Sequence, residues 1–196
     1  MSALFYRSLL LTTAMFFSAA ALADGKVGLD LSSEALRVQV SNTANMSADA
    51  EVDWDAGFLR VESDNGGPTR SLITATVRSV GDAGVARHQV DAALGVRAFW
   101  LNGGGFDAQA LGVGGALTAR LDGMDRLVFS SYAYYAPQII SFGDADAFLE
   151  WGGDVAYQVL RTGEVYLGYR QVKVDPKQGA DVTVDTGFHL GMRFGF

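Results

Sequence analysis

The last sixteen residues of the chain, DVTVDTGFHLGMRFGF, alternate between two kinds of side chain. Even positions of 181–196 carry Val, Thr, Phe, Leu and Met, while odd positions carry Asp, Thr, Gly, His and Arg. Successive side chains of a β-strand point to opposite faces, so this pattern predicts one long strand with an apolar and a polar face. A free edge along such a strand would invite aggregation, and we therefore expect it to lie inside a larger sheet.

Similar alternation recurs upstream, and no helical period stands out after residue 24. From residue 47 onward we count eight strands, an even number as in bacterial single-chain barrels. Residues 34–41 also read as a strand and would make nine. Either 24–46 is a periplasmic or lumenal segment, or 47–63 breaks near Asp55-Ala56-Gly57 to give ten strands, and we favour eight. Besides 181–196, the predicted strands are 47–55, 70–79, 87–100, 106–121, 126–137, 147–160 and 164–173.

The polar face of these strands decides between a soluble and a membrane barrel. It consists mainly of glycine, alanine and threonine with isolated charges, and the chain has 24 glycines but only three lysines. A water-facing surface normally carries many charged residues, whereas small side chains suit a crowded barrel interior. We therefore expect an all-β fold, a small antiparallel transmembrane β-barrel whose large apolar side chains face lipid and whose closed sheet pairs every backbone polar group.

The connections between predicted strands alternate in length, as they do in bacterial membrane barrels with short periplasmic turns and longer external loops. With the long loops outside, Trp54, Trp100 and Trp151 are expected to share the outer interfacial belt of aromatic side chains. Tyr132, Tyr134 and Tyr135 are assigned to a membrane girdle as well. Short turns are predicted at 81–84, 122–125 and 161–164, and longer connections at 62–69, 101–108, 137–147 and 174–181.

The N-terminal segment has the features of a cleaved secretory signal peptide. Arg7 precedes an apolar run from Leu9 to Ala21, and Ala21-Leu22-Ala23 fits the small-x-small rule for cleavage after Ala23. The run is shorter than the roughly 20 apolar residues of a membrane-spanning helix. We divide the chain into a signal peptide at 1–23, an N-terminal segment at 24–46 with an extra strand as an alternative, and an outer-membrane β-barrel at 47–196.

The charge and the absence of cysteine exclude several functions. The formal net charge is −7, which gives no electrostatic footprint for nucleic acid. The chain has no cysteine, so disulfides and thiolate metal sites are excluded. Two separated histidines, His88 and His189, are a poor basis for a metal site, and we expect no cofactor.

Charged residues on the predicted lumen face are the main candidates for function. Both signs occur in similar number, which favours interlocking ion pairs that fill a narrow bore, since buried charges need partners. The alternative is a charged constriction in a narrow small-solute channel. The lumen charge network is predicted to contain Asp91, Arg97, Arg120, Glu150, Asp154, Arg170, Asp185 and Arg193.

A membrane-embedded lipid hydrolase is the competing enzymatic hypothesis. It would need a serine within reach of a histidine and an acid. Ser130, Ser131 and Ser141 are the nearest candidates, but no sequence pattern couples them to His189 or His88. We therefore expect no enzymatic activity and no catalytic residues.

The chain resembles the YfaZ family of outer-membrane proteins, and the resemblance is clearest from about residue 94 to 196. It rests on LGVRAFW (94–100), YYAPQIISFGDADAFLEWG (134–152), VYLGYRQVKVD (165–175) and DVTVDTGFHLGMRFGF (181–196). The resemblance implies a signal peptide, a small membrane barrel and no established catalytic chemistry. Residues Phe188, Leu190, Met192, Phe194 and Phe196 also fit the C-terminal signal read by the outer-membrane barrel assembly machinery.

These observations predict a monomeric outer-membrane barrel of a Gram-negative-type envelope with a largely occluded polar lumen. Its expected role is non-enzymatic, in envelope structure or surface contact, with slow passage of small solutes as the alternative. Its expected partners are outer-membrane lipid, lipopolysaccharide and the barrel assembly machinery.

Overall fold

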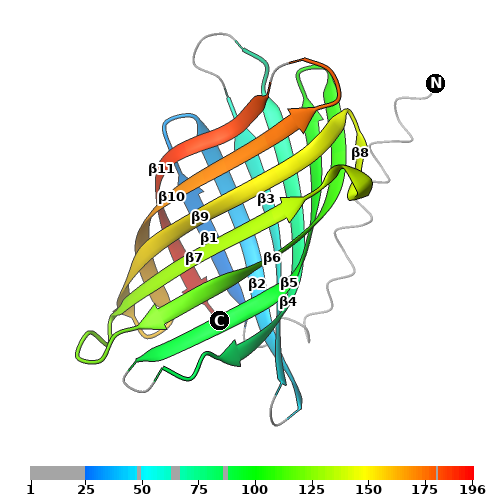
Figure 1. Ribbon diagram of the computed structural model, residues 1–196. Helices are drawn as coiled ribbons and strands as arrows, with labels where there is room; N and C mark the ends of the chain where they lie inside the picture. The colour runs from blue at the N-terminus through cyan, green and yellow to red at the C-terminus, as the bar shows by residue number, and fades with distance from the viewer. Residues whose placement is uncertain (1–24, 48–49, 63–66, 86–87, 180) are drawn as a thin grey trace, which may run out of the picture.

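The computed structural model describes residues 25–47, 50–62, 67–85, 88–179 and 181–196, so the predicted signal peptide and its cleavage site lie outside the described residues. These residues form a closed antiparallel β-barrel of ten strands (Figure 1). Neighbours around the ring are β1-β2-β3-β4-β5-β6-β7-β9-β10-β11, and pairing of β11 with β1 closes it. The elements are β1 (Lys26–Leu31), β2 (Ala35–Ser47), β3 (Ala50–Val61), β4 (Arg70–Asp82), β5 (Gln89–Gly103), β6 (Phe106–Arg120), β7 (Leu127–Ala136), η3 (Gln138–Ile140), β8 (Ser141–Gly143), β9 (Ala145–Leu160), β10 (Gly163–Pro176) and β11 (Val182–Gly195).

The preference for eight strands is wrong, and the alternative of ten is correct. Both additional strands come from the segment at 24–46, which forms the hairpin β1–β2, so the barrel begins at Lys26. The break proposed near Asp55 does not occur, because β3 runs unbroken through it. The strand β1 was not predicted because it is only six residues long. It nevertheless closes the ring by pairing with β11, from Lys26 opposite Gly195 to Leu31 opposite Leu190.

The ends of the barrel differ, and we name them by their contents. The terminal end holds Lys26 and Gly195, and it lies toward the bottom of Figure 1. The loop end holds the connections at 62–69 and 137–144. The long connection predicted at 101–108 is instead a tight turn, since Gly103 pairs directly with Phe106. Gly104 and Gly105 have φ values of 69° and 75°, which only glycine adopts at little cost, and this lets the strands continue to the turn.

The alternation in the last strand is interrupted by a β-bulge. Val172 pairs with Asp185 and Lys173 with Thr183, which leaves Val184 as the extra residue of β11. Beyond the bulge the faces exchange, so Val184 is buried in the interior and Val182 packs beside it. The prediction of one apolar outer face throughout 181–196 is therefore correct from Thr186 onward and wrong for the two valines.

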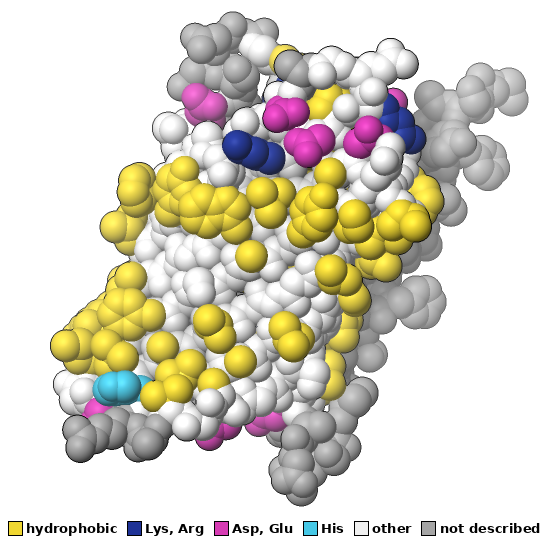
Figure 2. Space-filling view, in the orientation of Figure 1, with side chains coloured by type: hydrophobic (Ala, Val, Ile, Leu, Met, Phe, Trp, Pro, Cys, Tyr) yellow, Lys and Arg dark blue, Asp and Glu magenta, His cyan; other side chains and the backbone are white. Residues whose placement is uncertain are grey.

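The outer surface of the barrel is apolar and its interior carries the charges. Leu94 is 76% exposed and Phe188 71% exposed, whereas Arg97, Glu150 and Arg170 are buried. Figure 2 shows hydrophobic side chains gathered in an upper and a lower band, with acidic and basic side chains beyond the upper band. This inside-out distribution is the one that a β-barrel needs to span a bilayer. Among the described residues, no helix is long and apolar enough to cross a membrane.

Candidate functional site in the barrel interior

The barrel interior consists of successive layers along the strands. In β9 the inward residues run from Phe148 through Glu150 to Asp154, from the loop end toward the terminal end. In β10 they run from Val172 through Arg170 to Glu164. β5 repeats the order, with Leu101 and Phe99 before Arg97. Because neighbouring strands supply the same kind of residue at the same height, the interior has an apolar layer, an ion-pair layer and a polar cavity.

The apolar layer fills the barrel next to the loop end. The rings of Phe99 and Phe148 stack with their centroids 4.7 Å apart, and both side chains are fully buried. The buried members of the layer are Ala35, Leu59, Val61, Leu72, Phe99, Leu101, Ala108, Ala110, Tyr134, Ala136, Ala145, Phe148, Val172, Val174 and Val184.

Glu150 is the centre of the ion-pair layer. Its side chain is 1% exposed and accepts hydrogen bonds from Arg97 Nη1 at 2.9 Å and Arg37 Nη1 at 3.3 Å. The hydroxyl of Tyr132 donates a third hydrogen bond at 3.1 Å. Asp55 lies 3.6 Å from Arg97 Nη2 and provides a second carboxylate. Two positive and two negative side chains thus neutralise one another in the barrel interior, as buried charges require.

Arg170 joins β10 to the first and last strands of the barrel. Its Nε donates to Asp185 Oδ2 at 2.7 Å and its Nη1 to Asp30 Oδ1 at 3.1 Å. The hydroxyl of Tyr166 donates to the other oxygen of Asp30 at 3.1 Å. Since Asp30 lies on β1 and Asp185 on β11, these ion pairs link the first and last strands where the ring closes.

The charges nearer the terminal end are more accessible to water. Arg193 Nη2 lies 2.6 Å from Asp154 Oδ2, and Arg193 Nη1 lies 3.0 Å from Glu164 Oε1. Its guanidinium stacks 3.8 Å from the centre of the Tyr166 ring. Arg120 and Asp91 are 4.0 Å apart and partly exposed, so water screens this pair more strongly than the deep pairs.

The structure brings all eight charged residues predicted for the lumen into pairs with one another. The pairs are Arg97 with Glu150, Arg170 with Asp185, Arg193 with Asp154, and Arg120 with Asp91. The prediction omitted further members of the same network. Arg37 could have been found, because it alternates with Leu36 and Val38 in a strand-like segment. The other omitted members are Asp30, Asp53, Asp55, Arg78 and Glu164.

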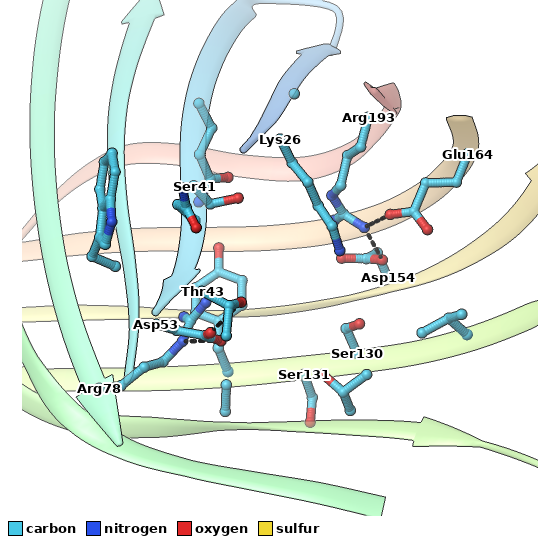
Figure 3. A pocket seen from close by; sticks show the side chains of 18 of the residues that line it. Lys26, Ser41, Thr43, Asp53, Arg78, Ser130, Ser131, Asp154, Glu164 and Arg193 are labelled. Atoms are coloured by element: carbon cyan, nitrogen blue, oxygen red, sulfur yellow. Dashed lines mark hydrogen bonds and ion pairs between the residues drawn. The ribbon is translucent and has the colours of Figure 1, made fainter. Parts of the chain in front are cut away.

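A polar cavity of about 250 Å³ lies between the ion-pair layer and the terminal end (Figure 3). A second hollow of about 310 Å³ shares Lys26, Arg120 and Arg193 with it and continues toward Phe196. Arg37 and Arg97 form the floor of the cavity, where the ion-pair layer begins. The walls carry hydroxyl and amide side chains, namely Gln39, Ser41, Asn42, Thr43, Thr118, Ser130 and Tyr132.

The serine and histidine candidates for hydrolysis are not joined. Ser131 lies on the outer face, whereas His189 is buried in the interior. Ser130 faces the cavity, but β9 and β10 separate its strand from β11, which carries His189. Ser141 bonds to the carbonyl of Pro137, and His88 accepts a bond from the Asp122 amide. Within the described ranges, no group of three or more His, Asp or Glu side chains is placed to hold a metal ion.

The aromatic assignments have mixed outcomes. Trp100 and Trp151 are exposed on the outer face, as are Phe188, Leu190, Met192, Phe194 and Phe196. Trp54 pairs with Val77 on β4, and Val77 pairs with Val96 on β5. Val96 lies four residues from Trp100 toward the terminal end, so strand pairing does not bring Trp54 level with Trp100. A belt shared by all three tryptophans and an insertion signal at the C-terminus both stay predictions.

The tyrosine cluster was misassigned to the girdle in two of its three members. Tyr135 is exposed, but Tyr132 and Tyr134 point inward, and the guanidinium of Arg97 lies 5.2 Å and 4.1 Å from the centres of their rings. Both faces of 126–137 are apolar in sequence, so alternation could not assign them. A large aromatic side chain inside the barrel covers the arginine with its ring face, which is an energetically favourable contact.

Comparisons with known proteins identify the family. Among solved structures, the outer membrane channel DcaP of Acinetobacter baumannii matches with a TM-score of 0.40 and 9% sequence identity, covering 82% of this chain and 63% of that chain. That similarity is too low to carry any activity across. No curated protein sequence matches significantly. The sequence profile described as YfaZ precursor matches residues 7–196, nearly the whole chain, and the protein therefore belongs to the YfaZ family.

Proposed function

We propose that this protein is an integral outer-membrane β-barrel with a closed interior and a non-enzymatic role in the envelope, in structure or surface contact. The observation that carries the proposal is the inverted distribution of side chains, with Leu94 and Phe188 exposed and Arg97, Glu150 and Arg170 buried. In water this distribution would be unstable, because it exposes large apolar surface and buries charge. In a bilayer the apolar exterior has lipid as its natural partner.

Two stacked barriers support a closed interior. The apolar layer around Phe99 and Phe148 presents mainly apolar side chains to a passing solute, although it also contains the hydroxyl of Tyr134. Beneath it, Glu150 holds Arg37 and Arg97 across the bore by side-chain contacts of 3.3 Å and 2.9 Å. A hydrated solute would have to break these ion pairs and then cross the apolar layer, and both steps are costly.

A narrow small-solute channel is the second candidate. The polar cavity at the terminal end favours it, because the bore is already lined by hydrophilic side chains there. The apolar layer then has to move for conduction to occur. We further propose that the barrel is monomeric, that lipid and lipopolysaccharide surround it, and that the barrel assembly machinery inserts it.

Planar-bilayer recordings of the purified barrel test the closed interior. We expect no discrete conductance steps from the wild-type protein. Arg97→Gln removes one of the cations from the ion-pair layer while the apolar layer remains, so it is expected to stay closed as well. Discrete steps in the wild type whose size or ion selectivity changes in Arg97→Gln would establish the channel instead.

The non-enzymatic part of the proposal is tested separately. Purified outer membranes containing wild-type protein or His189→Ala are compared for lipid hydrolysis. We expect the two to be equal, because the buried Nδ1 of His189 has no hydrogen-bond partner among the described residues. A lipid-modifying activity that is present in the wild type and lost in His189→Ala would contradict the proposal.

A further inference from the structure

The polar cavity at the terminal end has hydrogen-bonding groups that the protein itself does not use. Its carboxylates are engaged: Asp154 and Glu164 both pair with Arg193, and Asp53 pairs with Arg78 and accepts a hydrogen bond from Thr43. In contrast, the Lys26 ammonium points into the cavity and forms no ion pair within the described residues (Figure 3). The groups that remain available are therefore mainly donors.

Further donors line the same space. Among the described residues, the one ion-pair partner of Arg120 is Asp91, at 4.0 Å. Arg161, at the opening of the adjoining hollow, makes no ion pair with any described residue. The side chains of Gln39, Ser41, Thr118 and Ser130 face the cavity and form no side-chain hydrogen bond in the described part of the chain. A complementary ligand would carry a negative charge for the cations and several hydroxyl groups for the neutral walls.

The size of the cavity limits the ligand further. About 250 Å³ lies slightly below the roughly 300–1,000 Å³ of sites for drug-sized ligands, so the site suits a solute of monosaccharide size. The adjoining hollow of about 310 Å³ leads outward past Lys26 and Arg120, which places cations along the route of entry. Cations along a concave opening attract an anion before it reaches the binding position.

We propose that the terminal-end cavity binds a small hydroxylated carboxylate, of the chemical class of the sugar acids. Lys26 and Arg120 bind the carboxylate, and Ser41, Thr118 and Ser130 bind the hydroxyl groups. The solute enters from the terminal end and stops at the floor formed by Arg37 and Arg97. Binding of this kind is independent of whether the barrel conducts, so titration tests the site and bilayer recordings test the closed interior.

Isothermal titration of the folded barrel in detergent micelles with D-glucuronate tests the proposal. We expect saturable binding of D-glucuronate. Binding of D-glucose and of acetate should be at least about tenfold weaker, because D-glucose lacks the carboxylate and acetate lacks the hydroxyl groups. Lys26→Ala should weaken D-glucuronate binding about tenfold through loss of a charge-assisted hydrogen bond. Lys177→Ala, which removes the same charge between β10 and β11 at the loop end, should leave binding unchanged.

A second variant tests the walls of the cavity. Thr118→Val with Ser130→Ala removes two hydroxyl groups and should reduce the preference for D-glucuronate over acetate, while acetate affinity stays the same. Each variant is first checked for the heat-dependent gel mobility of a folded barrel. The proposal is overturned if D-glucuronate gives no saturable heat beyond that of D-glucose. It is equally overturned if Lys26→Ala and Lys177→Ala have the same effect.

Discussion

The two halves of the barrel interior are filled in opposite ways. Toward the loop end, Phe99, Phe148 and Leu72 pack into an apolar layer that resembles the core of a soluble protein. Toward the terminal end, Arg193, Asp154 and Glu164 surround a cavity that is open to water. The contrast shows that one closed sheet encloses both a packed apolar layer and a polar cavity.

The largest loss of stability is expected from a substitution in the ion-pair layer, which lies between the two halves of the interior. Glu150→Ala leaves Arg37 and Arg97 without their shared carboxylate in a buried position. We expect a loss of about 3–5 kcal/mol in the free energy of unfolding, the usual cost of a buried charge left unpaired. Urea titration of the barrel in lipid vesicles measures it.

Glu164→Gln is the matched control for that prediction. Glu164 is partly exposed, and Arg193 keeps Asp154 when Glu164 is neutralised. The control should cost less than about 1 kcal/mol. Equal losses in Glu150→Ala and Glu164→Gln would mean that the deep layer is as hydrated as the cavity below it.

A truncation in each half compares packing directly. Leu72 is 2% exposed in the apolar layer, and Leu72→Ala should lower the free energy of unfolding by about 2–5 kcal/mol because it leaves a void. Thr118→Ala in the wall of the polar cavity should cost less than about 1 kcal/mol, since water can replace the lost group. The same urea titration separates them, and similar costs would show that the two halves are packed alike.

Two glycine substitutions probe how closely the strands approach one another. A Cβ at Gly114 would lie 2.0 Å from the carbonyl oxygen of Ala133, which is fixed backbone, and Gly114→Ala should cost about 1–3 kcal/mol or more. At Gly28, beside the cavity, the nearest atom would be Arg193 Cγ at 3.5 Å, an ordinary contact. Gly28→Ala should therefore leave the urea midpoint almost unchanged, and a midpoint shift as large as that of Gly114→Ala would refute the difference in crowding.

The smallest effect is expected at the partly exposed pair of the terminal end. Asp91 and Arg120 are 4.0 Å apart, and Asp91→Asn should change the free energy of unfolding by less than about 1 kcal/mol. High salt should shift the urea midpoint of Asp91→Asn less than that of the wild type, because less screened attraction remains to be lost. A loss near that of Glu150→Ala would place this pair in the dry part of the interior.

Alternation predicted the faces of most strands but could not predict their number. The inward charges followed from parity, and Arg97, Glu150 and Arg170 lie where their positions in the sequence required. β1 was missed because a six-residue strand gives too few alternations to stand out from a loop. The bulge at Val184 was also missed, since one extra residue exchanges the faces without changing the sequence pattern.

The division of the interior into an apolar half and a polar half could not be predicted from the sequence. Which charges pair depends on strand register, and the pairing of β1 with β11 brings Asp30 to Arg170 across 140 positions of sequence. Tyr132 and Tyr134 were assigned to the wrong face, because both faces of β7 are apolar and alternation does not distinguish them. The apolar layer was not expected either, since its valines and alanines read like ordinary membrane-facing residues.

The pairing of the first strand with the last is the contact that joins the two ends of the described barrel. Six residue pairs between β1 and β11 complete the ring, whereas β10 and β11 share twelve. Until residues 190–195 are in place, the backbone groups of Lys26–Leu31 that face them have no partner, which hydrocarbon does not tolerate. The ring therefore cannot close before both β1 and β11 are in place, and the six residue pairs that close it are half the number that join β10 to β11.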